Sequence, residues 1–465
     1  MTNSFAGPLP LSGTTYVVRA FGCQMNLHDA ERVRGMLEQA GSLPVETYEE
    51  ADVVVFLTCC VREAADTRLY GQVATMRTLP LRTGAGCDRR IVAVGGCIGQ
   101  RDQEGLFTHL PNVDVVFGTH TLARVVELIT RVREGQDHIA AILDVDAPGE
   151  ASTDLPTHRD ADFHAWVPIT FGCNTFCTYC IVPYVRGRER SRDFDEVVRE
   201  VRHLAEQGTK EVTLLGQNVN SYGRDLYGKP RFADLLRACG EAGIPRLRFA
   251  TSHPKDLSDD TIAAMASTPA VMPALHLPAQ SGSSRVLKAM HRTYNREGYL
   301  RLVDKVRSAM PGIALSTDVI VGFPGETEED FLDTLSLVEQ VRYAQTFTFI
   351  YSRREGTPAA KMVDDTPREV IQGRFDRLVD AVQACAFEAN QPELGATLPV
   401  LFEGLSKRDE TMLTGRSPKN QTVHAPIPAG KLASDCIGQI MDVHVDEART
   451  WYLRGTVVLP GEASA

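Results

Sequence analysis

Residues 171–180 read FGCNTFCTYC and place Cys173, Cys177 and Cys180 at CxxxCxxC spacing, directly after an apolar segment. Three thiolates can hold three irons of a cubane iron-sulfur cluster and leave the fourth iron without a protein ligand. An iron with an open position can bind and reduce a small molecule. Structural zinc usually needs four ligands, and this run holds no fourth Cys or His. The spacing therefore favours an iron-sulfur cluster over zinc.

The central part of the chain, which begins with this run, alternates strand-like and helical patterns. Six apolar stretches, each followed by a helical pattern, lie near residues 165–170, 211–215, 246–250, 274–277, 314–320 and 344–350. Repeated strand and helix units are typical of parallel strands. Six units predict a partial (β/α)6 barrel, whose active site would lie at the carboxyl ends of the strands. We expect this domain to span residues 163–392.

The N-terminal part shows the same alternation and predicts a parallel α/β domain over residues 14–140. Its strand-like runs lie at 15–21, 53–57 and 91–94. One cysteine follows each run, and these are Cys23, Cys59 and Cys97. Ligands of open parallel sheets bind beyond the carboxyl ends of the strands. We therefore expect the three thiols to converge on a second three-cysteine site.

Two further segments complete the predicted α/β multi-domain organisation. Residues 141–162 turn polar and acidic and contain Pro and Gly, which predicts a linker. Residues 393–460 change pattern again, because short apolar runs are split there by Gly, Pro and Asp. That pattern is typical of a small antiparallel β-barrel.

Composition excludes several classes of protein. The chain has 465 residues, 43% of them apolar and 23% charged, as in a globular multi-domain protein. It contains no uninterrupted apolar run long enough to span a membrane, and residues 1–13 lack the pattern of a secretory signal. Eleven cysteines are too sparse for a disulfide scaffold. We expect a cytoplasmic protein without membrane attachment.

The net charge of -11 argues against a protein that coats nucleic acid non-specifically. A local basic patch remains compatible with it. Four arginines alternate directly after the cysteine run, at Arg186, Arg188, Arg190 and Arg192. They predict either positive charge near the proposed site or a solvated turn balanced by Glu189 and Asp193.

Several motifs together resemble the radical S-adenosylmethionine methylthiotransferase family. Besides the CxxxCxxC run they are GCQMN at 22–26, TCCVRE at 58–63, GC at 96–97, VPYVRG at 182–187, LGQNVN at 215–220, HLPAQSG at 276–282 and GFPGET at 322–327. The resemblance extends from about residue 14 to 458. It implies a methylthiotransferase domain, a radical S-adenosylmethionine barrel and a C-terminal TRAM domain.

The resemblance also implies the cofactors, which are two 4Fe-4S clusters and S-adenosylmethionine. The radical cluster, whose open iron chelates S-adenosylmethionine, would be held by Cys173, Cys177 and Cys180. The auxiliary cluster, which carries or donates sulfur, would be held by Cys23, Cys59 and Cys97. Contacts to S-adenosylmethionine are expected from Gly216, Gln217, Asn218 and Asp318. No catalytic residue is assigned beyond the cluster ligands.

Within the family, GCQMN together with VPYVRG is similar to the branch that methylthiolates isopentenylated adenosine at position 37 of tRNA. The implied reaction cleaves one S-adenosylmethionine to a 5'-deoxyadenosyl radical, which takes hydrogen from C2 of the adenine. A second S-adenosylmethionine supplies the methyl group. The cofactors must carry this chemistry, because no acid, base or nucleophilic side chain activates an aromatic C–H bond.

The resemblance further implies the partners of such an enzyme. The tRNA anticodon loop would contact the Arg186–Arg192 region and the C-terminal barrel, whose loops carry Lys407, Arg408, Arg416 and Lys419. An electron donor such as flavodoxin or ferredoxin is expected, the sulfur source stays open, and the protein is expected to be a monomer.

Three alternatives remain at this point. Sister branches of the family act on threonylcarbamoyl-adenosine in tRNA or on an aspartate of a ribosomal protein. A non-catalytic RNA-binding protein with a structural metal is the alternative from another class.

Cys60 lies beside Cys59 where the family usually has another small residue, and adjacent side chains in an extended stretch point in opposite directions. Leu57 stands where the family usually has Asn, which affects a local hydrogen bond rather than the ligand.

Overall fold

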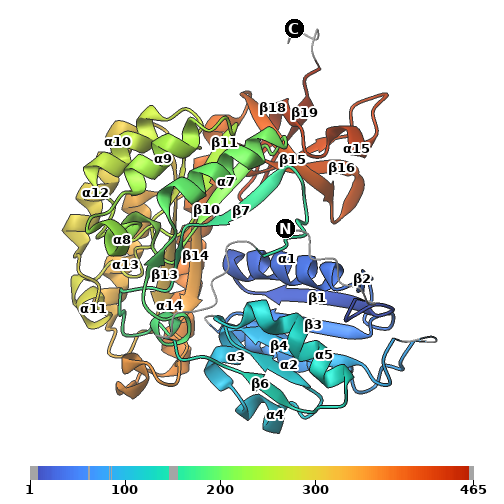
Figure 1. The fold of residues 1–465 in the computed structure, drawn as a ribbon. Coiled ribbons are helices and arrows are strands. Elements are labelled where there is room, and N and C mark those ends of the chain that lie inside the picture. The colour runs from blue at the N-terminus through green and yellow to red at the C-terminus, as the bar shows by residue number, and fades with distance from the viewer. Residues whose placement is uncertain (1–8, 61–62, 83, 85, 146–154, 460–465) are drawn as a thin grey trace. The chain divides into compact units, whose positions relative to one another are not determined.

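The computed structural model describes residues 9–459 except 61–62, 83, 85 and 146–154. Val61 and Arg62 of the TCCVRE run, much of the predicted linker and residue 460 therefore lie outside the described residues. The chain divides into two compact units (Figure 1). One contains residues 1–160, 171–175 and 180–189, and the other contains residues 161–170, 176–179 and 190–465.

The N-terminal unit is built on a parallel sheet of six strands in the order β2-β1-β3-β4-β5-β6. The strands are β1 (Thr15–Phe21), β2 (Leu43–Pro44), β3 (Val53–Thr58), β4 (Ile91–Gly96), β5 (Val115–Phe117) and β6 (Ile139–Ala141). The three strands expected from the sequence are β1, β3 and β4, which are neighbours at the centre of the sheet. The predicted parallel α/β domain is confirmed.

Helices cover both faces of this sheet. They are α1 (Gln24–Gln39), α2 (Glu63–Thr75), α3 (Cys97–Asp102), α4 (Gly105–His109), η1 (Leu122–Arg124) and α5 (Val125–Arg133). Val53, Val55 and Leu57 of β3 pack in one core cluster with residues of α1 and α5. Val54 and Phe56 pack in another with residues of α2, α3 and α4. A strand buried on both faces in this way reads as a continuous apolar run.

The second unit contains the predicted partial barrel, and all its strand pairings are parallel. Its strands are β7 (His164–Pro168), β10 (Glu211–Leu215), β11 (Arg246–Phe249), β12 (Ala274–His276), β13 (Ala314–Val321) and β14 (Gln345–Ile350). They form the sheets β11-β10-β7 and β12-β13-β14, which an isolated parallel bridge between Leu247 and Val271 connects. Each strand matches its expected stretch closely, so the barrel is confirmed.

The helices of the barrel pack on one face of its strands. The longer ones are α7 (Phe194–Glu206), α9 (Phe232–Gly240), α10 (Asp259–Ser267), α11 (Ser284–Ala289), α12 (Arg296–Ala309), α13 (Glu328–Val341) and α14 (Arg368–Asn390). The short elements of the central region are β8 (Thr170–Phe171), α6 (Val182–Arg186), β9 (Arg190–Ser191), η2 (Val219–Ser221), α8 (Arg224–Tyr227), η3 (Pro358–Lys361) and η4 (Gln391–Glu393). On β13, Leu315, Val319 and Val321 join the core, whereas Ser316 and Asp318 are half-buried on the other face of the strand.

The C-terminal segment forms a closed five-stranded barrel in the order β15-β16-β17-β19-β18. Its elements are β15 (Thr397–Ser406), β16 (Asp409–Arg416), β17 (Thr422–Pro426), α15 (Ala433–Cys436), β18 (Ile440–Ala448) and β19 (Leu453–Val457). The predicted barrel is confirmed with one refinement: β17 and β19 pair in parallel. A closed ring with an odd number of strands cannot alternate direction throughout, so one parallel pairing is unavoidable.

Two arginines at the amino-terminal end of β11 hold this barrel through its backbone. Arg246 Nη1 donates to the Arg416 carbonyl at 2.9 Å. Arg248 donates to the carbonyls of Ser417 at 2.8 Å and Pro418 at 3.0 Å. Lys419 also pairs with the buried Glu393 at 2.6 Å. The small barrel therefore lies at the end of the strands opposite to their carboxyl termini. In the part of the chain that the structure describes, no helix is both long and apolar enough to cross a membrane.

Candidate functional site

The structure brings Cys23, Cys59 and Cys97 to one edge of the N-terminal sheet, as expected. Phe21, Thr58 and Gly96, the last residues of β1, β3 and β4, are direct register partners. The cysteines follow within two residues, and the Cys59 amide donates to the Phe21 carbonyl at 3.0 Å. Cys59 and Cys97 are buried, and Cys23 is half-buried. Three neighbouring strands therefore present three thiols together.

The turns around these cysteines need glycine. Gly22 has φ of +116°, and a Cβ there would lie 2.2 Å from the Cys59 Cβ atom. Gly96, directly before Cys97, has φ of +81°. Side-chain-bearing residues rarely adopt such angles. Cys23 then begins α1 as its N-cap, because the amides of Asn26 and Leu27 donate to the Cys23 carbonyl. The helical pattern in the sequence is clear only from residue 29, and the helix starts five residues earlier for this reason.

A buried arginine contributes positive charge to this site. Arg186 is 6% exposed, and its Nε donates to Cys97 Sγ at 3.1 Å. Its Nη2 donates to Asn26 Oδ1 at 3.1 Å and pairs with Asp29 at 3.4 Å. Asn26 is itself fixed, since its Nδ2 donates to the Phe21 carbonyl at 3.0 Å. The residues of the GCQMN and VPYVRG motifs thus meet around one thiol.

Two of the three thiols ionise easily. A hydrogen bond from Cys59, opposed by burial and aided by the charge of Arg186, lowers the pKa of Cys23 to about 6. A hydrogen bond from Cys60, with the same opposing burial and the same arginine, lowers the pKa of Cys97 to about 7. Thiolates rather than thiols are metal ligands. The electrostatics of the pocket therefore suit metal binding.

Cys60 behaves differently from its neighbour Cys59. Its side chain is fully buried and packs with Cys97, Ile181 and Val185. The hydrogen bond to Cys97, together with burial, raises its pKa well above the usual value. Cys59 interacts instead with Cys23. The two adjacent thiols therefore face different partners, as expected for an extended stretch.

The three N-terminal cysteines have the chemistry that a 4Fe-4S cluster needs. Among the described residues, no group of three or more His, Cys, Asp or Glu side chains is arranged to hold one metal ion. A cubane cluster takes one thiolate per iron, so three thiols could bind three of its irons. All eleven cysteines of the chain are free thiols. Thiols on three strand ends beside a buried cation match the chemistry of an anionic cluster.

The central cysteine run is held at both ends of its loop. The Cys173 amide donates to the Gly187 carbonyl at 3.0 Å, and the Thr175 amide donates to Cys173 Sγ at 3.3 Å. Gly172 has φ of +73°, and a Cβ there would lie 2.1 Å from the Arg188 carbonyl oxygen. Cys173 is buried and Cys180 is half-buried. These contacts belong to the segments that group with the N-terminal unit.

Cys177 groups with the second unit, where a second buried arginine meets it. Arg292 is 8% exposed, and its Nη1 donates to Cys177 Sγ at 3.3 Å. Its Nη2 donates to the Pro278 carbonyl and its Nε to the Tyr294 hydroxyl. The following residue, Thr178, donates from its amide to the Met290 carbonyl at 3.1 Å. Arg292 could not be predicted from the sequence, because it lies 115 residues from Cys177.

Buried polar residues gather in the segments that follow β7, β10 and β11. Several buried polar atoms there have no hydrogen-bond partner among the described residues, namely Thr170 Oγ1, Asn218 Oδ1, Asn220 Oδ1 and Nδ2, Ser252 Oγ and His253 Nε2. Burial without a partner costs free energy, so such atoms are typical of a ligand site. Burial also lowers the pKa of His253 to about 2, so its ring stays neutral. These residues suit a polar ligand such as S-adenosylmethionine.

The four residues expected to contact S-adenosylmethionine lie in two places. Gly216, Gln217 and Asn218 follow β10 directly, and a Cβ at Gly216 would lie 2.3 Å from Thr170 Oγ1. Asn218 is buried and donates to Asp256 at 2.7 Å. Asp318 lies within β13 and pairs with His276 at 3.4 Å.

The matches to family models agree with this architecture. Residues 15–118 match the uncharacterized protein family UPF0004, residues 167–338 the radical SAM superfamily and residues 391–458 the TRAM domain. A tRNA-2-methylthio-N(6)-dimethylallyladenosine synthase of Acidothermus cellulolyticus is 50% identical over 90% of this chain and 84% of its own length. The chain belongs to this synthase family. The corresponding synthase of Carboxydothermus hydrogenoformans is 44% identical over 96% of this chain and 99% of its own length.

A solved structure supports the fold of the synthase. The radical S-adenosylmethionine methyltransferase TsrM from Kitasatospora setae, with cobalamin and a [4Fe-4S] cluster bound, matches with a TM-score of 0.54. It is 16% identical and covers 75% of this chain and 77% of its own. This match bears on the fold alone. The curated relatives confirm the family resemblance that the sequence motifs of this chain indicate.

One expectation for the synthase is wrong in part. The Arg186–Arg192 region was expected to present positive charge to RNA, but Arg186 and Arg192 are both buried. Arg186 binds Cys97, while Arg192 donates to the Pro168 carbonyl at 3.0 Å and to Glu200 at 2.7 Å. Of the other two arginines in this region, Arg188 is exposed and Arg190 is half-buried.

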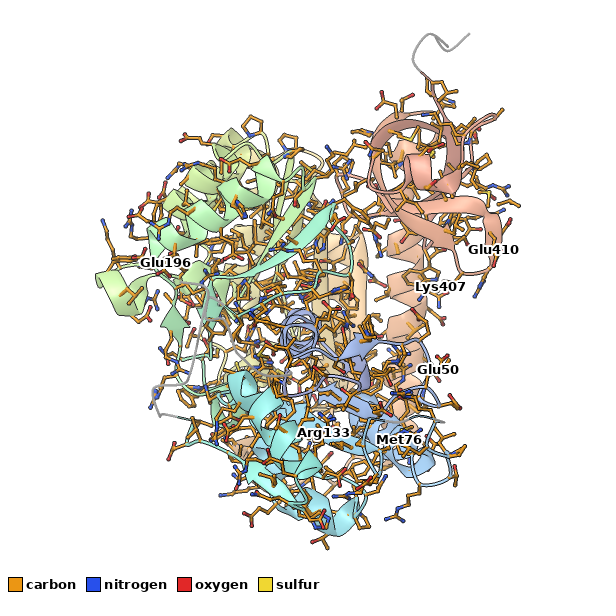
Figure 2. The ribbon with its side chains drawn as sticks, turned by 45° about the vertical axis from the view of Figure 1, so that its right-hand side comes forward. Glu50, Met76, Arg133, Glu196, Lys407 and Glu410 are labelled. Atoms are coloured by element: carbon orange, nitrogen blue, oxygen red, sulfur yellow. The ribbon has the colours of Figure 1, made fainter. Side chains whose placement is uncertain are left out.

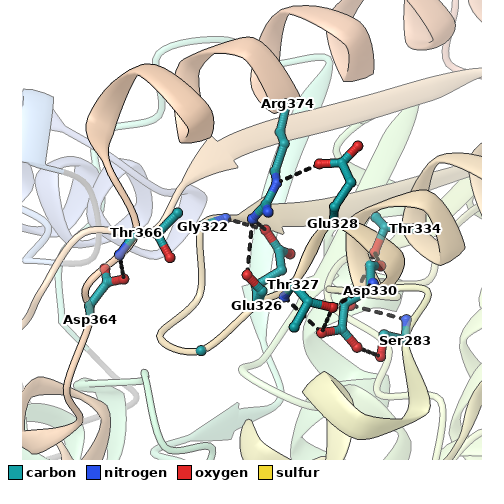
Figure 3. A network of polar contacts seen from close by, with 12 residues as sticks. Ser283, Gly322, Glu326, Thr327, Glu328, Asp330, Thr334, Asp364, Thr366 and Arg374 are labelled. Carbon is teal, nitrogen blue, oxygen red and sulfur yellow. Dashed lines mark hydrogen bonds and ion pairs between the residues drawn. The ribbon is translucent and has the colours of Figure 1, made fainter.

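The GFPGET motif of the synthase forms a polar network after β13 (Figure 3). Glu326 accepts from the Gly322 amide at 2.8 Å and pairs with Arg374 of α14 at 3.4 Å. Arg374 also donates to Glu328 at 3.0 Å. Thr327 caps α13 through a reciprocal bond with Asp330. The network fixes the loop at the carboxyl end of β13 to α14.

Proposed function

We propose that this chain methylthiolates C2 of N6-isopentenyladenosine at position 37 of tRNA, giving 2-methylthio-N6-isopentenyladenosine. The observation that carries the proposal is the near full-length similarity to synthases of this name, at 44–50% identity. The presence of two separate three-cysteine sets supports it, since a single radical cluster would need only one. The sister branches and a non-catalytic RNA-binding protein are not favoured by these relatives.

The two cysteine sets have different roles in this proposal. Cys173, Cys177 and Cys180 hold the radical cluster, and Cys23, Cys59 and Cys97 hold the auxiliary cluster. When bound, these clusters and S-adenosylmethionine supply the adenosyl radical that takes hydrogen from C2, the sulfur atom and the methyl group. Arg186 and Arg292 place a fixed positive charge beside one sulfur of each set.

The second unit binds and orients S-adenosylmethionine. Asn218, Asn220, Ser252 and His253 provide the unpaired polar atoms, and Gly216 leaves room beside Thr170. Asp318 and His276 face the same side of their strands and contribute polar groups. Fixed positioning matters, because a displacement of about 1 Å can cost about 100-fold in rate.

The tRNA anticodon loop is the proposed macromolecular partner, and the base must leave its stack to react. The TRAM barrel contributes to RNA binding. We place the domain boundaries at 14–140, 163–392 and 393–460, with a linker at 141–162. An electron donor such as flavodoxin or ferredoxin supplies the electron, and the working unit is a monomer.

Two measurements test the proposal. Nucleoside mass spectrometry of tRNA from a deletion strain should show loss of 2-methylthio-isopentenyladenosine, restored by the wild-type gene. Unchanged 2-methylthio-isopentenyladenosine would reject the substrate. Anaerobic reconstitution should give about eight irons per chain, and about half after Cys173, Cys177 and Cys180 are changed to Ala. A wild-type protein that never exceeds about four irons contradicts the two-cluster assignment.

A further inference from the structure

We infer that Arg186 is a positioning residue for the auxiliary cluster, which sets the reduction potential of that cluster and fixes the Cys180 segment beside it. The inference rests on the proposed assignment of Cys97 as a ligand. It concerns a residue that the motif pattern had suggested for RNA contact instead.

Three kinds of contact fix the guanidinium of Arg186 in one orientation. Nε donates to Cys97 Sγ at 3.1 Å, and Nη2 donates to Asn26 Oδ1 at 3.1 Å and pairs with Asp29 at 3.4 Å. The side chain is 6% exposed, and Asp29 is 15% exposed. A guanidinium that is buried and bound on several sides loses little freedom when it meets a ligand sulfur. Its charge is therefore present at the sulfur before any cluster binds.

A buried cation at a cluster sulfur changes the energy of adding an electron. Reduction adds negative charge to a cluster that thiolates already make anionic. Net charge, hydrogen bonds to the sulfurs and solvent exposure set the reduction potential of such clusters. Arg186 supplies both a charge and an N–H donor to Cys97, and both side chains are buried. The arginine stabilises the reduced form more than the oxidised form and so raises the potential.

Arg186 also lies six residues after Cys180 in the sequence. Arg186 ends α6, which begins two residues after Cys180. Ile181 and Val185 of this segment pack with Cys60 and Cys97, and Thr119 donates to the Val185 carbonyl at 2.9 Å. Gly187, the residue after α6, packs against the backbone of Val145. A Cβ atom at Gly187 would lie 2.1 Å from the Val145 carbonyl oxygen. Arg186 thereby locks the segment that carries Cys180 onto the auxiliary site.

The test uses a protein in which Cys173, Cys177 and Cys180 are changed to Ala, so that only the auxiliary cluster remains. Into this background we introduce Arg186→Leu, Arg186→Lys or Arg188→Leu. Iron content, the midpoint potential from a redox titration and the EPR spectrum of the reduced cluster are measured. Arg186→Leu is expected to shift the potential to more negative values and to change the spectrum. Arg186→Lys keeps the charge, so its potential should shift less.

Arg188→Leu is the matched control, because it removes an exposed arginine two residues away and should leave potential and spectrum unchanged. An Arg186→Leu protein with the potential and spectrum of its parent overturns the inference while the two-cluster proposal stands. If the background protein, in which only Cys173, Cys177 and Cys180 are changed, binds no cluster, the proposed function is contradicted instead. Should Arg186→Leu fail to fold by circular dichroism, Arg186→Gln replaces it. An unchanged potential in Arg186→Gln then overturns the inference.

Discussion

Gly22 shows how one residue without a side chain makes the auxiliary site possible. Its φ is +116°, and a Cβ atom at this position would lie only 2.2 Å from the Cys59 Cβ atom. We expect Gly22→Ala to cost roughly 1–3 kcal/mol of stability through backbone strain alone. The clash should also displace Cys59 and reduce the iron bound at this site. Chemical denaturation and iron content of the reconstituted protein measure the two effects.

A glycine in α2 provides the control for this substitution. Gly71 lies in the interior of the helix, is exposed and has no atom within 4 Å of an added Cβ. Gly71→Ala should stabilise the protein by roughly 0.5–1 kcal/mol, because alanine favours the helix. A Gly22→Ala protein as stable as wild type, with full iron, would contradict the steric argument.

At this scale the sequence predicted the cysteines well and the arginines poorly. Cys23, Cys59 and Cys97 could be predicted because each follows a strand, and parallel strands bring their ends together. The role of Arg186 could not, because its contacts with Cys97 and Asn26 span 89 and 160 residues of sequence. No local pattern encodes a contact of that kind. The ligand roles of the cysteines themselves stay predictions.

Among the elements, the loop after β13 carries a titratable group whose pKa changes on folding. Burial raises the pKa of Glu326 to about 7, against an ordinary value of 4.5, although Gly322 and Arg374 oppose the shift. The folded state therefore binds this proton more tightly than the unfolded chain. Its contribution favours folding at low pH and is lost as the pH rises from about 4.5 through about 7.

Glu326→Gln should remove this pH dependence, because glutamine does not ionise and can still accept from the Gly322 amide. We expect the free energy of unfolding to differ less between pH 5 and pH 8 in the variant than in wild type. Urea unfolding at both pH values measures the difference. Equal pH dependence in the two proteins would show that Glu326 does not titrate in this range.

The elements themselves were largely predictable, and the exceptions have physical causes. The six strands of the partial barrel could be predicted because each is followed by a clear helical pattern, even where the strand is as short as β12. The strands β5 and β6 have three residues each, too few to show a periodicity. The early start of α1 depends on amide bonds to the Cys23 carbonyl, which no propensity scale contains.

For the molecule as a whole, charge at the tip of the β15–β16 hairpin offers a test of RNA binding. Lys407 and Arg408 are exposed there, and Figure 2 labels Lys407 on the barrel. Changing both to Gln should weaken tRNA binding. With fewer phosphate contacts, binding of the variant releases fewer counterions. The slope of log K against log salt should therefore fall in magnitude by roughly 1–2. Filter binding at several salt concentrations measures both effects.

Two other lysines define the controls for that experiment. Lys229 is exposed on the loop between α8 and α9, and Lys229→Gln should leave the slope unchanged. Lys419 is paired with Glu393, so Lys419→Gln should affect stability rather than the salt slope. A double variant of Lys407 and Arg408 with the affinity and slope of wild type would exclude the hairpin tip as an RNA contact.

The attachment of the small barrel has a consequence for how such proteins change over generations. Arg246 and Arg248 donate to main-chain oxygens of the small barrel, at Pro399 and at residues 416–418. Main-chain oxygens are the same in every sequence that keeps the fold. The contacts of these two arginines therefore do not depend on which side chains the barrel carries at those positions, whereas the pair between Lys419 and Glu393 does.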